Sequence, residues 1–213
     1  MSLGPAPDPL AVDDAWVVVD KPAGWLAVPG RGPDKQDCLL ARLQSRWPDV
    51  LTVHRLDQAT SGLMVFARGA AAQRALSRAF ESRAVHKAYV ACVAGLVSPD
   101  SGEIDLPLAA DWPNRPRQQV DRQNGRPSRT RFEVLARDAP SNTTRLRLLP
   151  HTGRTHQLRV HLAAIGHPIL GDALYAGELA DARPLRLMLH ASELSFAHPV
   201  DGEPLSFTRP PPF

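Results

Sequence analysis

The stretch that decides the fold is His54-Arg55-Leu56-Asp57-Gln58-Ala59-Thr60-Ser61-Gly62, followed at once by the apolar run 63–67. The apolar run predicts a buried strand over 62–68, and the polar residues before it predict a turn that this strand holds in place. Thr60 and Ser61 are residue types that hydrogen-bond to nearby backbone and so stabilise such a turn. Asp57 is thereby presented beside a rigid strand, although an aspartate in a turn is far more often a local cap than a nucleophile.

Outward from this strand, apolar periodicity predicts a succession of short elements. Helices are expected where apolar residues recur every three or four positions, at 37–46, 70–82 and 155–165. Further strands are expected at 15–19, 86–94, 130–136, 144–149 and 187–196. The helix at 70–82 is expected to cover the back of the sheet, because it has one apolar face.

The order of these elements indicates an α+β protein. Strands outnumber helices and do not alternate with them regularly, as they would in a doubly wound parallel sheet. The polar–apolar alternation at 130–136 and 144–149 is typical of half-exposed antiparallel strands. We therefore expect a mixed, mainly antiparallel central sheet flanked by helices and loops. With 213 residues, we expect a flexible N-terminal segment at 1–14 and a single catalytic domain at 15–213.

Composition favours a polyanionic partner and an address in the cytoplasm. The net charge is only +3, but 22 of the 25 basic residues are arginine, whose planar fork suits phosphates and base edges. Seven arginines lie in 111–137, which indicates a loop facing a polyanion or, alternatively, a merely solvated surface. No apolar run is long enough to span a membrane, and the first ten residues lack the apolar stretch of a secretory signal. Cys38 and Cys92 predict neither a disulfide framework nor a zinc site.

His-Arg-Leu-Asp followed by Thr-Ser-Gly and an apolar strand resembles the signature of the RluA family of pseudouridine synthases. The resemblance continues in Lys87-Ala88-Tyr89, in Gly153-Arg154-Thr155-His156-Gln157-Leu158-Arg159, and in 166–172. It covers roughly residues 15 to 207. The stretch Asp111-Trp112-Pro113-Asn114-Arg115-Pro116 further resembles the subgroup that acts on large-subunit ribosomal RNA and transfer RNA. The resemblance implies the pseudouridine synthase fold, with an active-site cleft across the sheet and no cofactor.

The family resemblance implies three catalytic residues. Asp57 would be the carboxylate that attacks uridine, so that the base detaches, rotates and rejoins through carbon 5. Arg159 would keep this carboxylate ionised and orient it through two hydrogen bonds, the alternative being a surface ion pair. Tyr89 would stack on the base and accept the proton that leaves carbon 5, the alternative being a core tyrosine with a satisfied hydroxyl.

RNA is expected to bind through basic residues around these three. Arg55 would fill the space left by the extruded uridine, or else contact a backbone phosphate. His54 would order the turn or contact phosphate. The expected RNA-binding set is His54, Arg55, Arg115, Arg117, Arg154 and His156. The protein is expected to act as a monomer on a stem-loop of ribosomal or transfer RNA, read by its shape and unstacked bases.

Two other classes of function remain open at this point. The first is an RNA-binding or ribosome assembly factor that keeps the fold but performs no chemistry. The second is a metal-dependent hydrolase, for which the sequence offers few parts. His151, His156 and His161 are five residues apart, a spacing that gathers them on neither a helix nor a strand. No metal site is therefore expected.

Overall fold

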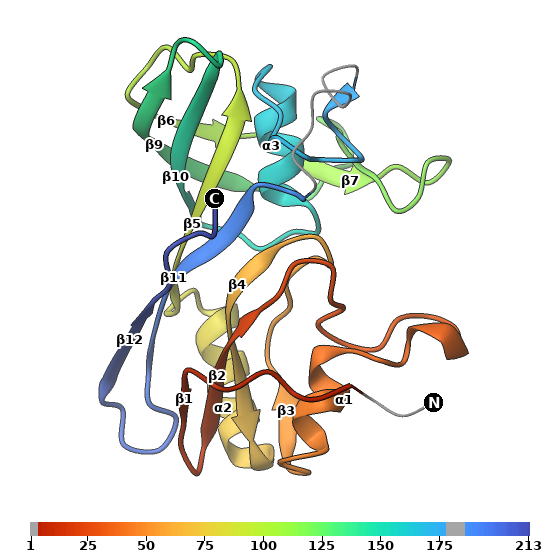
Figure 1. Ribbon diagram of the computed structural model, residues 1–213, viewed down its shortest axis with the longest axis vertical. Helices are drawn as coiled ribbons and strands as arrows, with labels where there is room; N and C mark the ends of the chain where they lie inside the picture. Colours follow the sequence, from red (N-terminus) through yellow and green to blue (C-terminus); the bar gives the residue numbers. More distant parts are fainter. Residues whose placement is uncertain (1–3, 178–185) are drawn as a thin grey trace. The chain divides into compact units, whose positions relative to one another are not determined.

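The computed structural model describes residues 4–177 and 186–213, and the chain divides into two compact units (Figure 1). Unit 1 comprises Met1–Lys87 and Ala191–Pro212, and unit 2 comprises Ala88–His190 with Phe213. Unit 1 contains β1 (Ala11–Val12), β2 (Trp16–Lys21), the 3-10 helix η1 (Pro33–Lys35), α1 (Leu39–Gln44), β3 (Val50–Thr52), β4 (Ser61–Arg68), α2 (Gly69–Glu81), most of β11 (Leu189–Ala197) and β12 (Pro204–Thr208).

The strands of unit 1 follow the order β1-β2-β4-β11, and β3 and β12 pair with β4 and β11. β2 runs antiparallel to β4, with Val18 opposite Val65. Seven of the eight residues of β4 are buried. A strand that is buried on both faces requires a continuous apolar run, and this is what 63–67 supplies.

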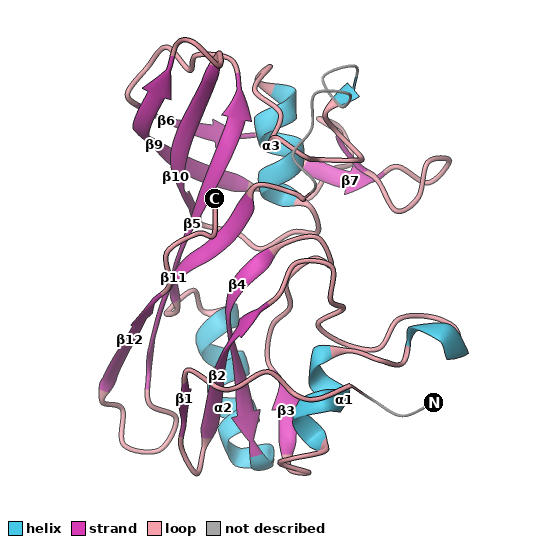
Figure 2. Ribbon diagram, viewed as in Figure 1, coloured by secondary structure: helices cyan, strands magenta, loops and turns pink. Residues whose placement is uncertain are grey.

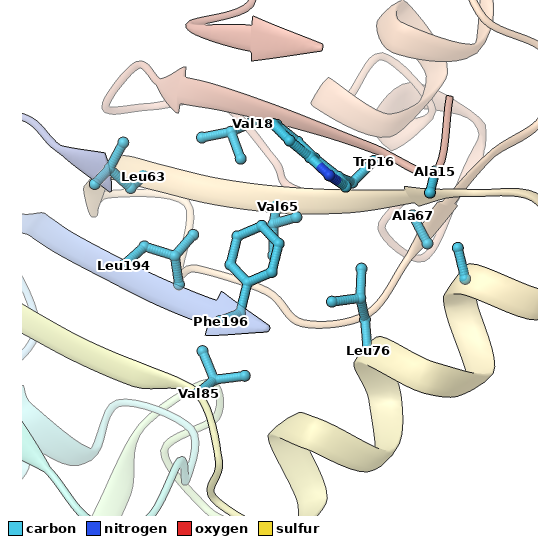
Figure 3. Close-up of a cluster of buried hydrophobic side chains, with 11 residues drawn as sticks. Ala15, Trp16, Val18, Leu63, Val65, Ala67, Leu76, Val85, Leu194 and Phe196 are labelled. Carbon is cyan, nitrogen blue, oxygen red and sulfur yellow. The ribbon is translucent and has the colours of Figure 1, made fainter. Parts of the chain in front are cut away.

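The core of unit 1 lies between β4, β11 and α2 (Figure 3). Alternate residues of β4 point to the same side, so Leu63, Val65 and Ala67 all enter this cluster. α2 contributes Leu76, and β2 contributes Trp16, which meets Phe196 edge to face at 5.9 Å between ring centroids. α2 therefore packs on the sheet as its apolar face predicts.

Over its described residues, unit 2 is built from an antiparallel sheet, a separate hairpin and the helix α3 (Figure 2). Its sheet has the order β5-β10-β9-β6, and the two-stranded sheet is β7-β8. The elements are β5 (His86–Ala94), whose first two residues belong to unit 1, then β6 (Ser101–Asp105), β7 (Leu108–Ala110), β8 (Gln118–Val120), β9 (Arg129–Asp138), β10 (Thr143–Pro150) and α3 (Gln157–Ala164). Thr144, Leu146 and Leu148 alternate into the core, as the sequence pattern predicts.

The fold class expected from the sequence is confirmed, with corrections to individual elements. No strand is predicted after the one at 187–196, but β12 follows it and pairs with β11. The arginine-rich segment 111–137 is not a loop throughout, since it contains β8 and most of β9. β8 has the sequence Gln-Gln-Val, which carries no periodic signal, so only pairing with β7 makes it a strand. The single domain over 15–213 and the flexible segment 1–14 stay predictions.

None of the helices in the described part of the chain combines the length and the apolar character that crossing a membrane requires.

Candidate active site

Asp57 lies in unit 1, in a turn that is tied down on both sides. Leu56 anchors the turn, being only 5% exposed, while Asp57 itself is partly exposed. The backbone N–H of Thr60 donates to the carbonyl of Asp57 at 3.1 Å, and both Thr60 and Ser61 are buried. The turn expected from the sequence is therefore present, and it holds a carboxylate at the start of the most buried strand of unit 1.

A buried lysine clamps the same turn to the end of β2. Lys21 is fully buried, and its Nζ donates to the carbonyls of Pro22, Trp25 and Gln58 at 2.8, 2.9 and 3.1 Å. Gly24 adds two bonds, since its N–H donates to the Gln58 carbonyl at 2.8 Å and its carbonyl accepts from Gln58 Nε2 at 3.0 Å. Three carbonyl dipoles offset the cost of burying the ammonium group. Gln58, the residue after Asp57, is thus held by three hydrogen bonds that sequence reasoning did not foresee.

Gly62 is required by the close approach of another strand. Its φ is +116°, and a Cβ at this position would lie 2.4 Å from the carbonyl oxygen of Ala191 in β11. No side chain fits there, because the obstruction is backbone. The glycine that ends the turn therefore allows β11 to pass directly beside it.

His54 is a structural residue of the turn. Its Nε2 accepts the N–H of Val65 at 3.1 Å, and its ring stacks on Phe80 with centroids 4.4 Å apart. Burial and the nearby Lys87 ammonium lower the pKa of His54 from its usual 6.5 to about 3. The ring is therefore neutral at physiological pH, which supports the turn-ordering role over contact with phosphate.

The lowered pKa of His54 predicts a loss of stability in mild acid. Between about pH 6.5 and 3 the unfolded chain binds a proton at this histidine and the folded chain does not. The free energy of unfolding should therefore fall as the pH drops through this window, by at most about 1.4 kcal/mol per pH unit from this residue. His54→Gln retains an acceptor for Val65 but does not titrate. Urea unfolding at several pH values should give a shallower slope for the variant, and parallel curves would contradict the assignment.

A hollow of about 380 Å³ adjoins the turn within unit 1. Trp25 and Gln58 line it, with the guanidinium of Arg42 lying 3.9 Å from the centre of the Trp25 ring. The charges along its wall balance, because Lys35 and Arg42 face Asp34 and Asp37. The carboxylate turn thus has an open polar surface on one side.

Arg159 lies in unit 2, on α3, and forms a buried ion pair with Asp172 of the same unit. Its Nε and Nη2 donate to Oδ2 and Oδ1 of Asp172, both at 2.7 Å. Arg159 is 5% exposed and Asp172 is 1% exposed, so the alternative of a surface ion pair is wrong. Asp172 Oδ1 also accepts the N–H groups of Leu174 and Tyr175. The carboxylate that orients this fork in unit 2 is therefore Asp172.

Tyr175 joins the residues around this buried pair. Its hydroxyl accepts the N–H of Gln118 at 2.8 Å and lies 2.7 Å from His156 Nδ1. The guanidinium groups of Arg159 and Arg117 lie 5.1 and 5.5 Å from the centre of its ring. Tyr175 thus connects α3 to the β7–β8 hairpin and brings three residues of the expected set together.

Gln157 shapes the loop that precedes α3. Its amide oxygen accepts from Thr152 Oγ1 and from the N–H of Arg154, and its amide nitrogen donates to the Arg129 carbonyl and to Thr130 Oγ1. All four bonds measure between 2.7 and 3.0 Å. A buried amide with each of its bonding positions used is a strong orienting group. It holds Arg154, whose Nε also donates to the Pro127 carbonyl at 3.3 Å.

The remaining residues of the expected set occupy three different surroundings. Tyr89 lies on β5 opposite Leu148 of β10, partly exposed between the buried Ala88 and Val90. Arg55 is exposed in unit 1, and Arg115 is exposed at the tip of the β7–β8 hairpin. The expected set is thus divided: His54, Arg55 and Asp57 belong to unit 1, and the other six residues belong to unit 2.

Sequence reasoning missed Lys21, Asp172 and Tyr175. Each acts through partners that are distant in the chain: Gln58 is 37 residues from Lys21, and Gln118 is 57 residues from Tyr175. The available signals were weak. Lys21 stands just before Pro22 and Gly24, and Asp172 follows a glycine. Such residues are common in turns, so their types alone do not indicate a role in the site.

Comparisons with known proteins agree with this geometry. A family profile described as RNA pseudouridylate synthase matches residues 15–164. The dual-specificity RNA pseudouridine synthase RluA of Vibrio vulnificus is 54% identical over 190 residues, covering 88% of this chain and 76% of its own. The protein of the same name from Escherichia coli K12 is 49% identical over 201 residues, covering 94% and 91%.

Solved structures give the same assignment. The human RNA pseudouridylate synthase domain containing 1 superposes with a TM-score of 0.79 at 32% identity, covering 100% of this chain and 87% of its own. The human domain-containing 4 protein gives a TM-score of 0.76 at 26% identity, covering 96% and 88%. The profile match spans the Asp57 turn, β5 and α3, the segments that carry all three expected catalytic residues. This chain therefore belongs to the RNA pseudouridylate synthase family.

Proposed function

We propose that this chain is a dual-specificity RNA pseudouridine synthase that isomerises uridine in large-subunit ribosomal RNA and in the anticodon stem-loop of transfer RNA. The observation that carries the proposal is Asp57, a partly exposed carboxylate on a turn fixed by Lys21, Gly24 and Thr60. Relatives named for dual specificity that align with nearly the whole chain support the choice of RNA. We further propose that the chain works as a monomer in the cytoplasm, where both RNAs are found.

The reaction needs a carboxylate, an orienting cation and a base. Asp57 attacks the uridine, the bond from the sugar to nitrogen 1 breaks, a bond from the sugar to carbon 5 forms, and the bond to Asp57 breaks so that the carboxylate is regenerated. The proton on carbon 5 leaves and nitrogen 1 gains one, so the reaction is an isomerisation with no net change in atoms. Tyr89 is the proposed acceptor of the carbon 5 proton, directly or through water. Arg159 is the proposed cation, and its orientation is maintained by Asp172.

Release of tritium from uridine labelled at carbon 5 tests the activity. Transfer RNA and ribosomal RNA transcribed with this label should each lose tritium to water when incubated with the protein. Chelators should leave the rate unchanged, because no step of the proposed reaction uses a metal. RNA binding without any release would instead support the alternative, a non-catalytic RNA-binding or assembly factor.

A further inference from the structure

The tip of the β7–β8 hairpin exposes a tryptophan to solvent. Trp112 is 69% exposed to solvent. Among the residues described, 4–177 and 186–213, no other phenylalanine, tryptophan or tyrosine is exposed. The hairpin extends outward from α3 within unit 2 (Figure 1). Isolated exposed aliphatic residues are common and need no explanation, but a large aromatic surface that stays in water is typical of binding sites.

The surroundings of Trp112 fix its orientation. The guanidinium of Arg115 lies 3.3 Å from the centre of the indole ring. The backbone closes beneath the pair, since the N–H of Asp111 donates to the Arg117 carbonyl at 3.0 Å and the N–H of Asn114 donates to the Asp111 carbonyl at 3.1 Å. Asn114 Nδ2 also donates to both carboxylate oxygens of Asp111, at 3.1 and 3.0 Å. The backbone that carries the tryptophan and the arginine is thus closed before any ligand binds, which lowers the entropic cost of binding.

The charges around the tip favour a polyanion. Arg117, Arg122 and Arg126 are exposed on the hairpin and the segment after it. The two carboxylates nearby are already engaged: Asp111 bonds to Asn114, and Asp121 accepts the N–H groups of Gln123 and Asn124. These backbone bonds also lower the pKa of Asp121, so the carboxylate is satisfied within its own turn. The arginines of 111–126 outnumber these two carboxylates, so the net charge that an approaching ligand meets is positive.

We propose that Trp112 and Arg115 form a stacking platform that holds an unpaired base of the RNA substrate. A flat aromatic ring capped by a planar guanidinium matches a nucleobase, because unstacked bases bind to aromatic rings and to arginine planes. The surrounding arginines neutralise the phosphates on either side of that base. This platform deepens the proposed function and rests on it, since it assigns a specificity residue to the same substrate.

Substitution of Trp112 tests the platform. Trp112→Ala should weaken the affinity for an anticodon stem-loop about tenfold, the effect of losing one base–aromatic stack. The matched control is Val200→Ala, which removes an apolar side chain that is 79% exposed in the β11–β12 hairpin, and it should bind as the wild type does. Arg115→Lys keeps the charge but loses the planar group, so it should weaken binding without changing its salt dependence.

A cycle with abasic RNA identifies stacking directly. Unpaired loop bases are removed one at a time, and each RNA is titrated with wild type and with Trp112→Ala. At one position the abasic RNA should weaken binding to the wild type but not to the variant, because the partner of that base is already gone. Equal affinity of Trp112→Ala and wild type, or additive losses at every loop position, would overturn the proposal. The titration does not need turnover, so failed tritium release would count against the proposed function alone.

Discussion

Asp57→Asn is expected to abolish pseudouridine formation while the affinity for RNA stays within a few fold of wild type. The amide has the size of the carboxylate but is a far weaker nucleophile, so the rate should fall by roughly 10³-fold or more, as losses of a catalytic nucleophile do. The turn should survive, because the substitution leaves unchanged the backbone bond from Thr60 to Asp57 and the bonds from Lys21 and Gly24 to Gln58. Tritium release gives the rate, and filter binding of the same RNA gives the affinity.

Asp14→Asn is the matched control for the loss of one negative charge in unit 1. Its side chain is fully exposed, and its ion pair with Arg68 measures 3.9 Å, so its removal should alter neither rate nor affinity. Full activity of Asp57→Asn would contradict the proposed chemistry. Loss of activity and RNA affinity together would show that Asp57 shapes the binding surface instead.

Asp172→Ala is expected to destabilise unit 2 strongly. It leaves the guanidinium of Arg159 buried without its fork partner, and removing one member of a buried pair costs about 3–5 kcal/mol. The N–H groups of Leu174 and Tyr175 lose their acceptor as well. Against a typical total of about 5–15 kcal/mol, this is a large fraction. Thermal melts followed by circular dichroism should show a fall in Tm of about 10 °C.

A double variant separates stability from chemistry. Arg159→Met with Asp172→Asn removes both buried charges, and the new amide oxygen still accepts the turn N–H groups. Most of the lost stability should return, because a buried pair replaced by neutral groups is often close to neutral in free energy. Tritium release should nevertheless stay absent if Arg159 acts on the nucleotide. A stable and active double variant would show that Arg159 has only a structural role. A wild-type Tm for Asp172→Ala would show that the buried Arg159–Asp172 pair does not stabilise unit 2.

Apolar patterns in the sequence predicted most of the helices and strands. They did not predict a strand that forms only because it pairs with a neighbouring strand. The predicted strand 62–68 and the predicted helix 70–82 correspond to β4 and α2 within a residue at each end, because both bury a continuous or periodic apolar surface. β8 lacked such a pattern and became a strand through hydrogen bonding to β7, which no local window contains. β12 alternates Leu205 and Phe207 with Ser206 and Thr208, as a half-buried strand does, and it pairs with β11.

For the Asp57 turn, the sequence by itself determined which carboxylate is presented and which strand supports it, since that information is contiguous in 54–67. Only the tertiary structure decided what holds the site residues. Lys21, at the end of β2, donates a hydrogen bond to the Gln58 carbonyl in the turn. Asp172 accepts hydrogen bonds from the guanidinium of Arg159, and the Tyr175 hydroxyl accepts the N–H of Gln118 in the β7–β8 hairpin. The physical reason is that charged and polar groups are satisfied by whichever partners folding buries beside them, and these partners lie up to 57 residues away in the chain.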